Sequence, residues 1–93
     1  MKLLLFILKN CPYCKEALRW MDELKNENPE YRDIEVKIID EKEEAELANS
    51  YDYYYVPTYF YGNIKLHEGA ATKDKIRQVF DEYLRLSKEQ ASV

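Results

Sequence analysis

The sequence predicts a single α/β domain in which a four-stranded mixed sheet is flanked by three helices. Three observations favour this fold class: an unbroken aliphatic run near the start, two segments with apolar residues at helical spacing, and a Gly-Asn turn between strand-like runs. A chain of 93 residues, 46% hydrophobic and 34% charged, suffices for one core but not for two. We therefore interpret residues 1–93 as one domain.

The first half of the chain predicts a β-α-β unit. Leu3 to Leu8 is continuous and aliphatic, which is typical of a central strand buried on both faces. Pro12 suits the first turn of a helix, and apolar residues recur at helical spacing until residues 26–29 end the run. Residues 34–38 then alternate between apolar and charged, as a half-covered strand does. A helical crossover makes these two strands parallel.

A short helix and a hairpin are expected next. Asp40 can cap a charged segment with a thin apolar stripe, and the acidic run at 40–46 is interpreted as a solvated helix face. Residues 58–61 have strong strand character, Gly62-Asn63 turns the chain, and residues 64–68 return as a short partner strand. Strands joined by so tight a turn are antiparallel.

The last segment predicts the third helix. Thr72 offers an N-cap, and apolar residues from Ile76 to Leu86 give a broad apolar face. Residues 87–93 are expected to be a frayed polar tail. The resulting element order is β-α-β-α-β-β-α.

Charge and hydropathy exclude several classes of partner. Fourteen Lys and Arg against eighteen Asp and Glu give a net charge of −4, so the chain lacks the positive field that nucleic acid or an anionic membrane attracts. No apolar run reaches the ~18 residues of a membrane span, and no cleavage site follows the first strand. We expect a cytoplasmic monomer with no nucleic-acid and no membrane partner.

The chemistry of the sequence centres on Cys11 and Cys14. They follow the predicted central strand and open the first helix, where small α/β domains place their sites. The positive end of that helix favours a thiolate at Cys11, and Lys9 and Lys15 add positive charge. Spacing of i, i+3 brings the sulfurs within reach of a reversible disulfide. We expect exposed Cys11 to attack a substrate disulfide and shielded Cys14 to resolve the mixed disulfide.

Three other interpretations of the cysteine pair stay open. A structural disulfide closing so short a loop would remove little chain entropy. Two thiolates leave a metal site incomplete, so an iron–sulfur cluster would need a second chain, and we assign no metal ligands within this one. An inert buried pair is the third. The single histidine, His67, is expected on the open side of the hairpin, outside the site.

The segment Cys11-Pro12-Tyr13-Cys14 resembles the active-site sequence of dithiol glutaredoxins, and Val56-Pro57 before a strand resembles their cis-proline segment. The resemblance spans nearly the whole chain and implies a thioredoxin fold. It also implies that Pro57 is cis and faces the cysteines, while the Val56 backbone bonds an extended substrate such as glutathione or a peptide. Tyr13 would form an aromatic wall at the rim. From the residues alone, Pro57 also fits an ordinary trans proline that begins an edge strand.

The sequence departs from the glutaredoxin pattern at the residues that would select the reductant. Glutaredoxins carry Gly-Gly and an acidic pair at the start of the last helix, where they hold the γ-glutamyl end of glutathione. Here that stretch is Gly69-Ala70-Ala71-Thr72-Lys73-Asp74, so Thr72, Lys73 and Asp74 are the candidate residues. Lys9 lies close to the position of the lysine that binds the glycyl carboxylate. Glutathione and thioredoxin reductase both stay open as electron donors.

The sequence therefore predicts a glutaredoxin-like thiol–disulfide oxidoreductase for protein or glutathione disulfides. We expect no tightly bound cofactor, with glutathione as a candidate reductant. The first alternative is a redoxin reduced by thioredoxin reductase. The second is a non-catalytic module, in which two chains share an iron–sulfur cluster through Cys11 or a tyrosine-rich surface docks a partner (Tyr51, Tyr53, Tyr54 and Tyr55).

Overall fold

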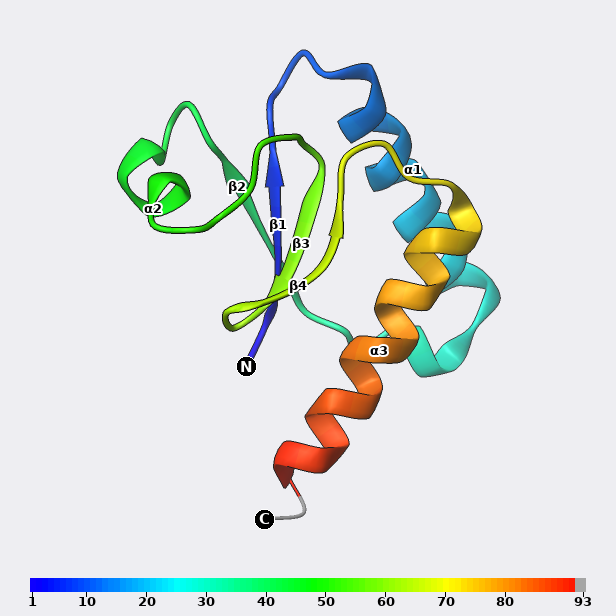
Figure 1. Cartoon of the computed structure of the whole chain (residues 1–93). Helices are drawn as coiled ribbons and strands as arrows, with labels where there is room; N and C mark the ends of the chain where they lie inside the picture. Colours follow the sequence, from blue (N-terminus) through cyan, green and yellow to red (C-terminus); the bar gives the residue numbers. More distant parts are fainter. Residues whose placement is uncertain (92–93) are drawn as a thin grey trace.

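A computed structural model of the protein describes the backbone of residues 1–91 and the side chains of residues 1–89. Its elements are β1 (Leu3–Ile7), α1 (Pro12–Glu27), the one-turn 3-10 helix η1 (Pro29–Tyr31), β2 (Val36–Asp40), α2 (Ala45–Asn49), β3 (Thr58–Tyr61), β4 (Ile64–Glu68) and α3 (Lys73–Ala91). Helices α1 and α3 cover one face of the sheet, and α2 covers the other (Figure 1). The predicted element order is confirmed, with η1 as an addition.

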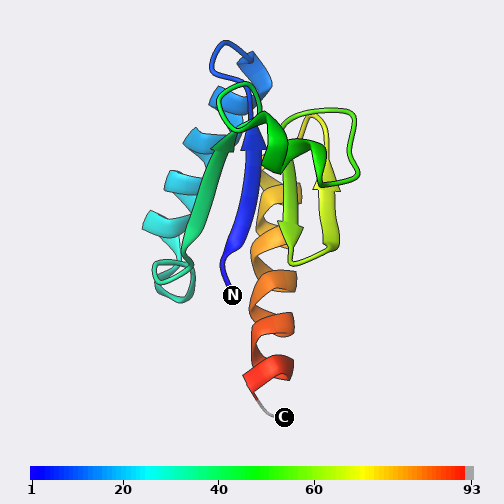
Figure 2. The same cartoon turned by 90° about the vertical axis from the view of Figure 1, so that its left-hand side faces the viewer.

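The sheet has the strand order β2-β1-β3-β4 (Figure 2). β1 pairs in parallel with β2 and antiparallel with β3, and β3 pairs antiparallel with β4. β1 is central, as its aliphatic run predicts, because both of its faces are covered. Its carboxyl end meets the carboxyl end of β2 and the amino end of β3 at one edge of the sheet.

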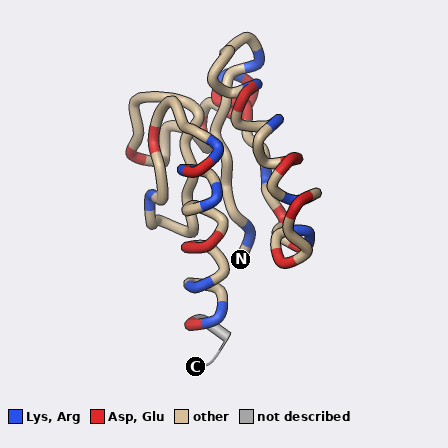
Figure 3. The backbone as a smooth tube through the Cα atoms, turned by 90° about the vertical axis from the view of Figure 1, so that its right-hand side faces the viewer, with Lys and Arg blue, Asp and Glu red and all other residues tan. Residues whose placement is uncertain are grey.

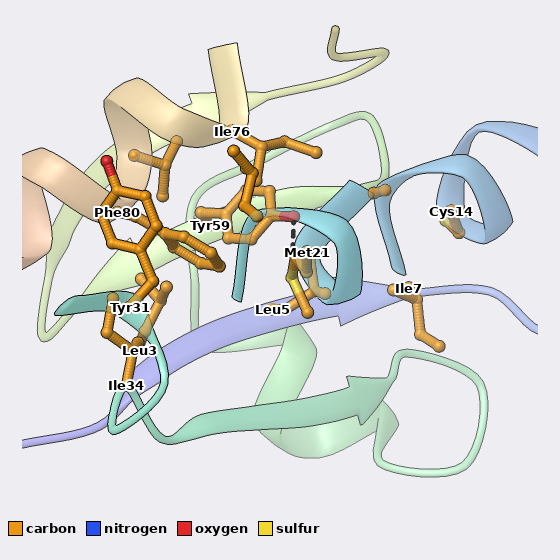
Figure 4. Packing of buried hydrophobic residues seen from close by; sticks show 13 residues of the cluster. Leu3, Leu5, Ile7, Cys14, Met21, Tyr31, Ile34, Tyr59, Ile76 and Phe80 are labelled. Atoms are coloured by element: carbon orange, nitrogen blue, oxygen red, sulfur yellow. Dashed lines mark hydrogen bonds between the residues drawn. The ribbon is translucent and has the colours of Figure 1, made fainter. Parts of the chain in front are cut away.

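The larger core fills the space between the sheet and helices α1 and α3. It contains buried residues from β1, α1, η1, the loop before β2, β3 and α3, and Figure 4 shows them, with Cys14 at the end nearest the tip of β1. The hydroxyl of fully buried Tyr59 donates to the sulfur of Met21 at 3.2 Å, which satisfies the one polar atom of that ring. The helices are thus fixed against the strand that precedes the cysteines.

The smaller core lies on the opposite face, under α2. Its buried members are Phe6, Ile39, Ala48 and Phe60. Two half-buried tyrosines close it, with the rings of Tyr51 and Tyr53 centred 4.9 and 5.0 Å from that of Phe6. This face therefore depends on aromatic rings from a loop rather than on a long helix.

The second strand differs from its prediction. β2 begins at Val36, and Ile38 is 47% exposed while Ile39 is buried. The physical reason is position, because β2 is an edge strand, so Ile38 stays exposed although it pairs with the fully buried Leu5. The cap is also displaced: Asp40 accepts hydrogen bonds from the backbone of Lys42 at 2.8 Å and Glu43 at 3.2 Å, so it caps the turn before α2.

The predicted frayed tail is wrong over residues 87–91, because α3 continues to Ala91; residues 92–93 lie outside the described chain. Basic and acidic residues are interspersed along this helix (Figure 3). Arg85 forms ion pairs with Glu82 and Glu89 at spacings of i, i+3 and i, i+4, which support the last turns. No helix in the described residues has the length and hydropathy needed to cross a membrane.

Candidate active site

Cys11 is the N-cap residue of α1, in the loop after β1. Its backbone is extended, with φ −86° and ψ 117°, and its sulfur accepts a hydrogen bond from the backbone N–H of Cys14 at 3.4 Å. Pro12 occupies the first helical turn, where a backbone N–H has no acceptor within the helix, so the N–H that proline lacks costs no hydrogen bond. The Cys11 sulfur therefore lies against the positive end of the helix, the environment that stabilises a thiolate.

The two cysteines differ sharply in exposure. Cys11 is partly exposed, whereas Cys14 is only 1% exposed, and both are free thiols. Burial raises the pKa of Cys14 to about 12, the Cys11 sulfur and Glu41 add to the rise, and a hydrogen bond with the Leu8 backbone opposes it. Cys14 is therefore a neutral, shielded thiol near pH 7, and Cys11 is the sulfur that a disulfide can reach.

A cleft of about 520 Å³ opens beside Cys11. The end of β2 and the loops that follow β1 and β2 line it, through Leu8, Lys9, Asn10, Cys11, Asp40, Lys42 and Glu43. The ammonium of Lys9 forms an ion pair with the carboxylate of Glu43, and this contact raises the pKa of Lys9. The predicted lysine is thus beside Cys11, but a carboxylate of the same chain already neutralises it.

The Val56-Pro57 peptide bond is cis, as the family resemblance implies, and Pro57 is fully buried. Thr58 pairs with Phe6 near the end of β1, so the two residues before Thr58 lie at the same edge of the sheet as the cysteines. The carbonyl of Pro57 accepts a hydrogen bond from Gly69 at 2.8 Å. Within the described residues, the backbone N–H and C=O of Val56 make no hydrogen bond, which leaves them available to a ligand.

The side chains at the start of α3 make contacts within α3 and with α1. Thr72 is the predicted N-cap, because its hydroxyl accepts from the backbone of Lys75 at 3.1 Å. The ammonium of Lys73 bonds Glu23 at 3.3 Å and Glu27 at 2.5 Å, both on α1. Since Glu23 is twelve residues beyond Cys11, this contact lies about 18 Å along the helix axis from the cysteine. Lys73 therefore joins α3 to α1, away from the cleft.

The neighbour of Lys73 is also paired locally. The carboxylate of Asp74 forms an ion pair with Arg77 and accepts from Gln78 at 3.0 Å. Tyr13 is exposed on α1 between the cysteines, as a rim residue would be. His67 is half-buried on β4, with a ring nitrogen 3.2 Å from the carbonyl of Ala70, and it takes no part in the cleft.

Three acidic residues near the cleft and the cis-proline loop were not singled out by the sequence. Glu41 is half-buried after β2, and its charge raises the pKa of both Cys14 and Tyr53. Glu43 pairs with Lys9, and Glu68 bonds the loop before Val56. Glu41 and Glu43 lie in the acidic run that was interpreted as a solvated helix face, so neither was predicted to lie near the cysteines. No local pattern around Glu68 predicts its contact with the loop.

A dithiol at the start of α1, together with a cis-proline loop at the same edge of a β2-β1-β3-β4 sheet, defines a dithiol protein of the thioredoxin fold. The chain belongs to the glutaredoxin family, whose pattern it matches over residues 3–65, more than half of its length. No curated protein matches the chain. Membership supports thiol–disulfide oxidoreductase activity in general, and the matched region includes both cysteines and Val56-Pro57 but ends before Thr72.

Proposed function

We propose that the protein is a dithiol disulfide reductase in which Cys11 is the nucleophile and Cys14 the resolving thiol. The observation that carries this proposal is the asymmetry of the pair. The Cys11 sulfur is accessible and accepts the Cys14 amide at the helix end, whereas Cys14 is buried behind it with a raised pKa. A structural disulfide or an inert pair gives no reason for one sulfur to face an open cleft.

In the first step, the Cys11 thiolate attacks one sulfur of the substrate disulfide. A bond forms between Cys11 and that sulfur, the substrate S–S bond breaks, and the other substrate sulfur leaves as a thiolate that takes a proton. The amide of Cys14 and the helix end stabilise the negative charge on Cys11 before the attack. The product is a mixed disulfide, and no net reduction has yet occurred.

In the second step, Cys14 loses its proton and attacks the sulfur of Cys11. The Cys11–Cys14 disulfide forms, the mixed disulfide breaks, and the second substrate sulfur leaves, so two electrons have passed from the protein dithiol to the substrate. Once Cys11 is bonded, its charge no longer raises the pKa of Cys14, which removes part of the barrier to proton loss. A thiol reductant then returns both cysteines to the dithiol.

The substrate is proposed to lie along the edge formed by the cleft and the cis-proline loop. The N–H and C=O of Val56, unpaired within the described chain, can bond one residue of an extended substrate as a strand would. Pro57 holds that residue beside the cysteines, and exposed Tyr13 offers an aromatic wall. Lys9 can meet a substrate carboxylate only by leaving Glu43.

A second candidate concerns the electron donor, which is proposed to be a flavoprotein such as thioredoxin reductase rather than glutathione. Four contacts favour it: Lys73 bonds two glutamates on α1, Asp74 pairs with Arg77, and Lys9 pairs with Glu43. Glutathione would have to displace these pairs to use the same side chains. A reducing compartment such as the cytoplasm fits either donor, because it keeps the dithiol reduced.

The test supplies the purified protein with a protein disulfide and two reducing systems, glutathione with its reductase and NADPH with thioredoxin reductase. We expect turnover, at least tenfold faster with thioredoxin reductase, and its complete loss in Cys11→Ser. Cys14→Ser should keep the first step with a glutathione mixed disulfide while losing reduction of the protein disulfide. Equal turnover in Cys11→Ser overturns the proposal. Visible absorbance with dimeric elution and no reductase activity favours the iron–sulfur alternative.

A further inference from the structure

The loop before the cis-proline displays two aromatic side chains to solvent. Tyr54 is 85% exposed and Tyr55 is 71% exposed, the two highest values among the large exposed hydrophobic residues of the described chain. Tyrosine is large, rigid and amphipathic, and such residues are enriched where proteins bind other polypeptides. The two other tyrosines of the segment, Tyr51 and Tyr53, pack on Phe6 instead.

Glu68 at the end of β4 fixes the backbone of this loop. One carboxylate oxygen accepts from the N–H of Tyr54 at 2.5 Å and from that of Tyr55 at 3.0 Å, and the other accepts from Lys65 at 2.7 Å. The Lys65 contact, followed by the two amides, lowers the pKa of Glu68 to about 2. The hydroxyl of Thr58 donates to the carbonyl of Tyr55, so the loop is held on both sides.

Tyr54 and Tyr55 lie next to Val56, the residue whose backbone would form hydrogen bonds with a substrate. Val56 follows Tyr55 directly, and within the described residues its backbone N–H and C=O are unbonded. An extended polypeptide advances about 3.3 Å per residue, so a chain that bonds Val56 passes the two tyrosines within its next few residues. A small disulfide that enters the cleft beside Cys11 does not extend that far.

We propose that Tyr54 and Tyr55 form a docking surface for an extended polypeptide segment that flanks the substrate disulfide, with Glu68 as the positioning residue. This inference rests on the proposed function. The occupant is apolar or aromatic, because the surface offers two exposed tyrosine rings while Lys65 pairs with Glu68 beneath the loop. Protein disulfides would then be preferred over small ones by contacts outside the cleft.

The experiment measures single turnovers, so that no electron donor is needed. Reduced protein is mixed with either an unfolded peptide containing a disulfide between apolar residues or the small disulfide of β-mercaptoethanol, and quenched samples are analysed by chromatography. Three variants are compared: Tyr54→Ala with Tyr55→Ala, Glu68→Ala, and Glu68→Gln. Ile64→Ala is the matched control, because Ile64 is 51% exposed on the same hairpin at its far end.

We expect the double tyrosine variant to lower the second-order rate constant with the peptide by about tenfold, and with the small disulfide by less than twofold. Glu68→Ala should raise the peptide concentration needed for half-maximal rate without changing the maximal rate. Glu68→Gln should recover most of this loss, because its amide oxygen can still accept from both backbone N–H groups. Ile64→Ala should match the wild type with both substrates.

Three outcomes overturn the inference. These are an unchanged peptide rate in the double variant, an equal loss with both substrates, or concentration-dependent dimers that the double variant abolishes, since the surface would then join two copies of the chain. If Glu68→Ala fails to fold, the double tyrosine variant still tests the inference, because both tyrosine side chains are exposed and their removal should not prevent folding. A wild-type protein that reacts with neither disulfide contradicts the proposed function instead.

Discussion

The two faces of the sheet are covered in different ways. On one face, the long helices α1 and α3 bury aliphatic residues of β1 together with Cys14. On the other, the five-residue helix α2 contributes one buried residue, Ala48, and loop tyrosines complete the cover. Val56 packs against both cores, so the cis-proline loop lies where they meet.

The two faces of the sheet therefore support different parts of the candidate site. The helical face fixes the cysteines, because α1 carries both of them and is packed along its length. The aromatic face supports the loop that is proposed to receive the substrate, through rings that are only half buried. The proposed nucleophile thus lies on a rigid scaffold and the proposed binding segment is less deeply packed, a common division between scaffold and site.

The largest expected effect is on the helical face. Phe80 is fully buried and its ring centre lies 5.3 Å from that of Tyr31. Phe80→Ala should lower the free energy of unfolding by about 3–5 kcal/mol, because it removes packing and leaves a cavity. Tyr51→Ala on the other face should lower it by only about 1–2 kcal/mol, since that ring is half-exposed. Urea unfolding measures both free energies. Equal losses in the two variants would contradict the difference in packing between the two faces.

The turn before α2 should give the next largest effect. Asp40→Ala removes the acceptor for the backbone of Lys42 and Glu43, so we expect a loss of about 1–2 kcal/mol in the free energy of unfolding. Asp40→Asn is the control, because its amide oxygen can accept the same bonds. If both variants lose equal stability in thermal unfolding, the negative charge matters rather than the cap.

A smaller effect of opposite sign is expected at Tyr53. Its hydroxyl is the one buried side-chain polar atom in the described residues without a hydrogen-bond partner, and burial raises its pKa to about 12. Tyr53→Phe should stabilise the protein by up to about 1 kcal/mol, because the unsatisfied group is removed while its ring is kept. Tyr51→Phe should change nothing. A clear loss in Tyr53→Phe would indicate a partner that the hydroxyl finds in solution.

The smallest effect concerns acid stability. The pKa of Glu68 is about 2 in the folded protein, below its ordinary value of 4.5, so its contribution is present above pH 4.5 and is lost as pH falls toward 2. Glu68→Gln cannot titrate there. The difference in stability between wild type and variant should therefore shrink over this window in chemical unfolding at each pH. A constant difference would mean that Glu68 acts through packing alone.

Local patterns predicted much of the fold. The aliphatic run of β1, the helical spacing in α1 and α3, and the Gly62-Asn63 turn each act within a few residues, so the parallel first pair and the antiparallel hairpin followed from connection rules. The order of the four strands across the sheet was not among these predictions. Cys11 and Cys14 could be placed for the same reason, because their spacing and the start of α1 are local. The exposure of Ile38 was mispredicted because the edge position of β2 is a property of the whole sheet. The length of α3 was mispredicted although the spacing of Arg85 and Glu89, which supports its last turns, is local.

The sequence by itself determined the dithiol, its place after the central strand and its asymmetry, because these depend on neighbouring residues and one helix end. Only the tertiary structure decided which of the candidate site residues are already paired within the chain. Lys9 meets Glu43, Lys73 meets Glu23, and Tyr54 meets Glu68 across separations of 34, 50 and 14 residues. Such contacts depend on how the elements pack, and no spacing along the chain encodes them. The placement of the dithiol is therefore a local property, and the pairing of the other candidate site residues is a tertiary one.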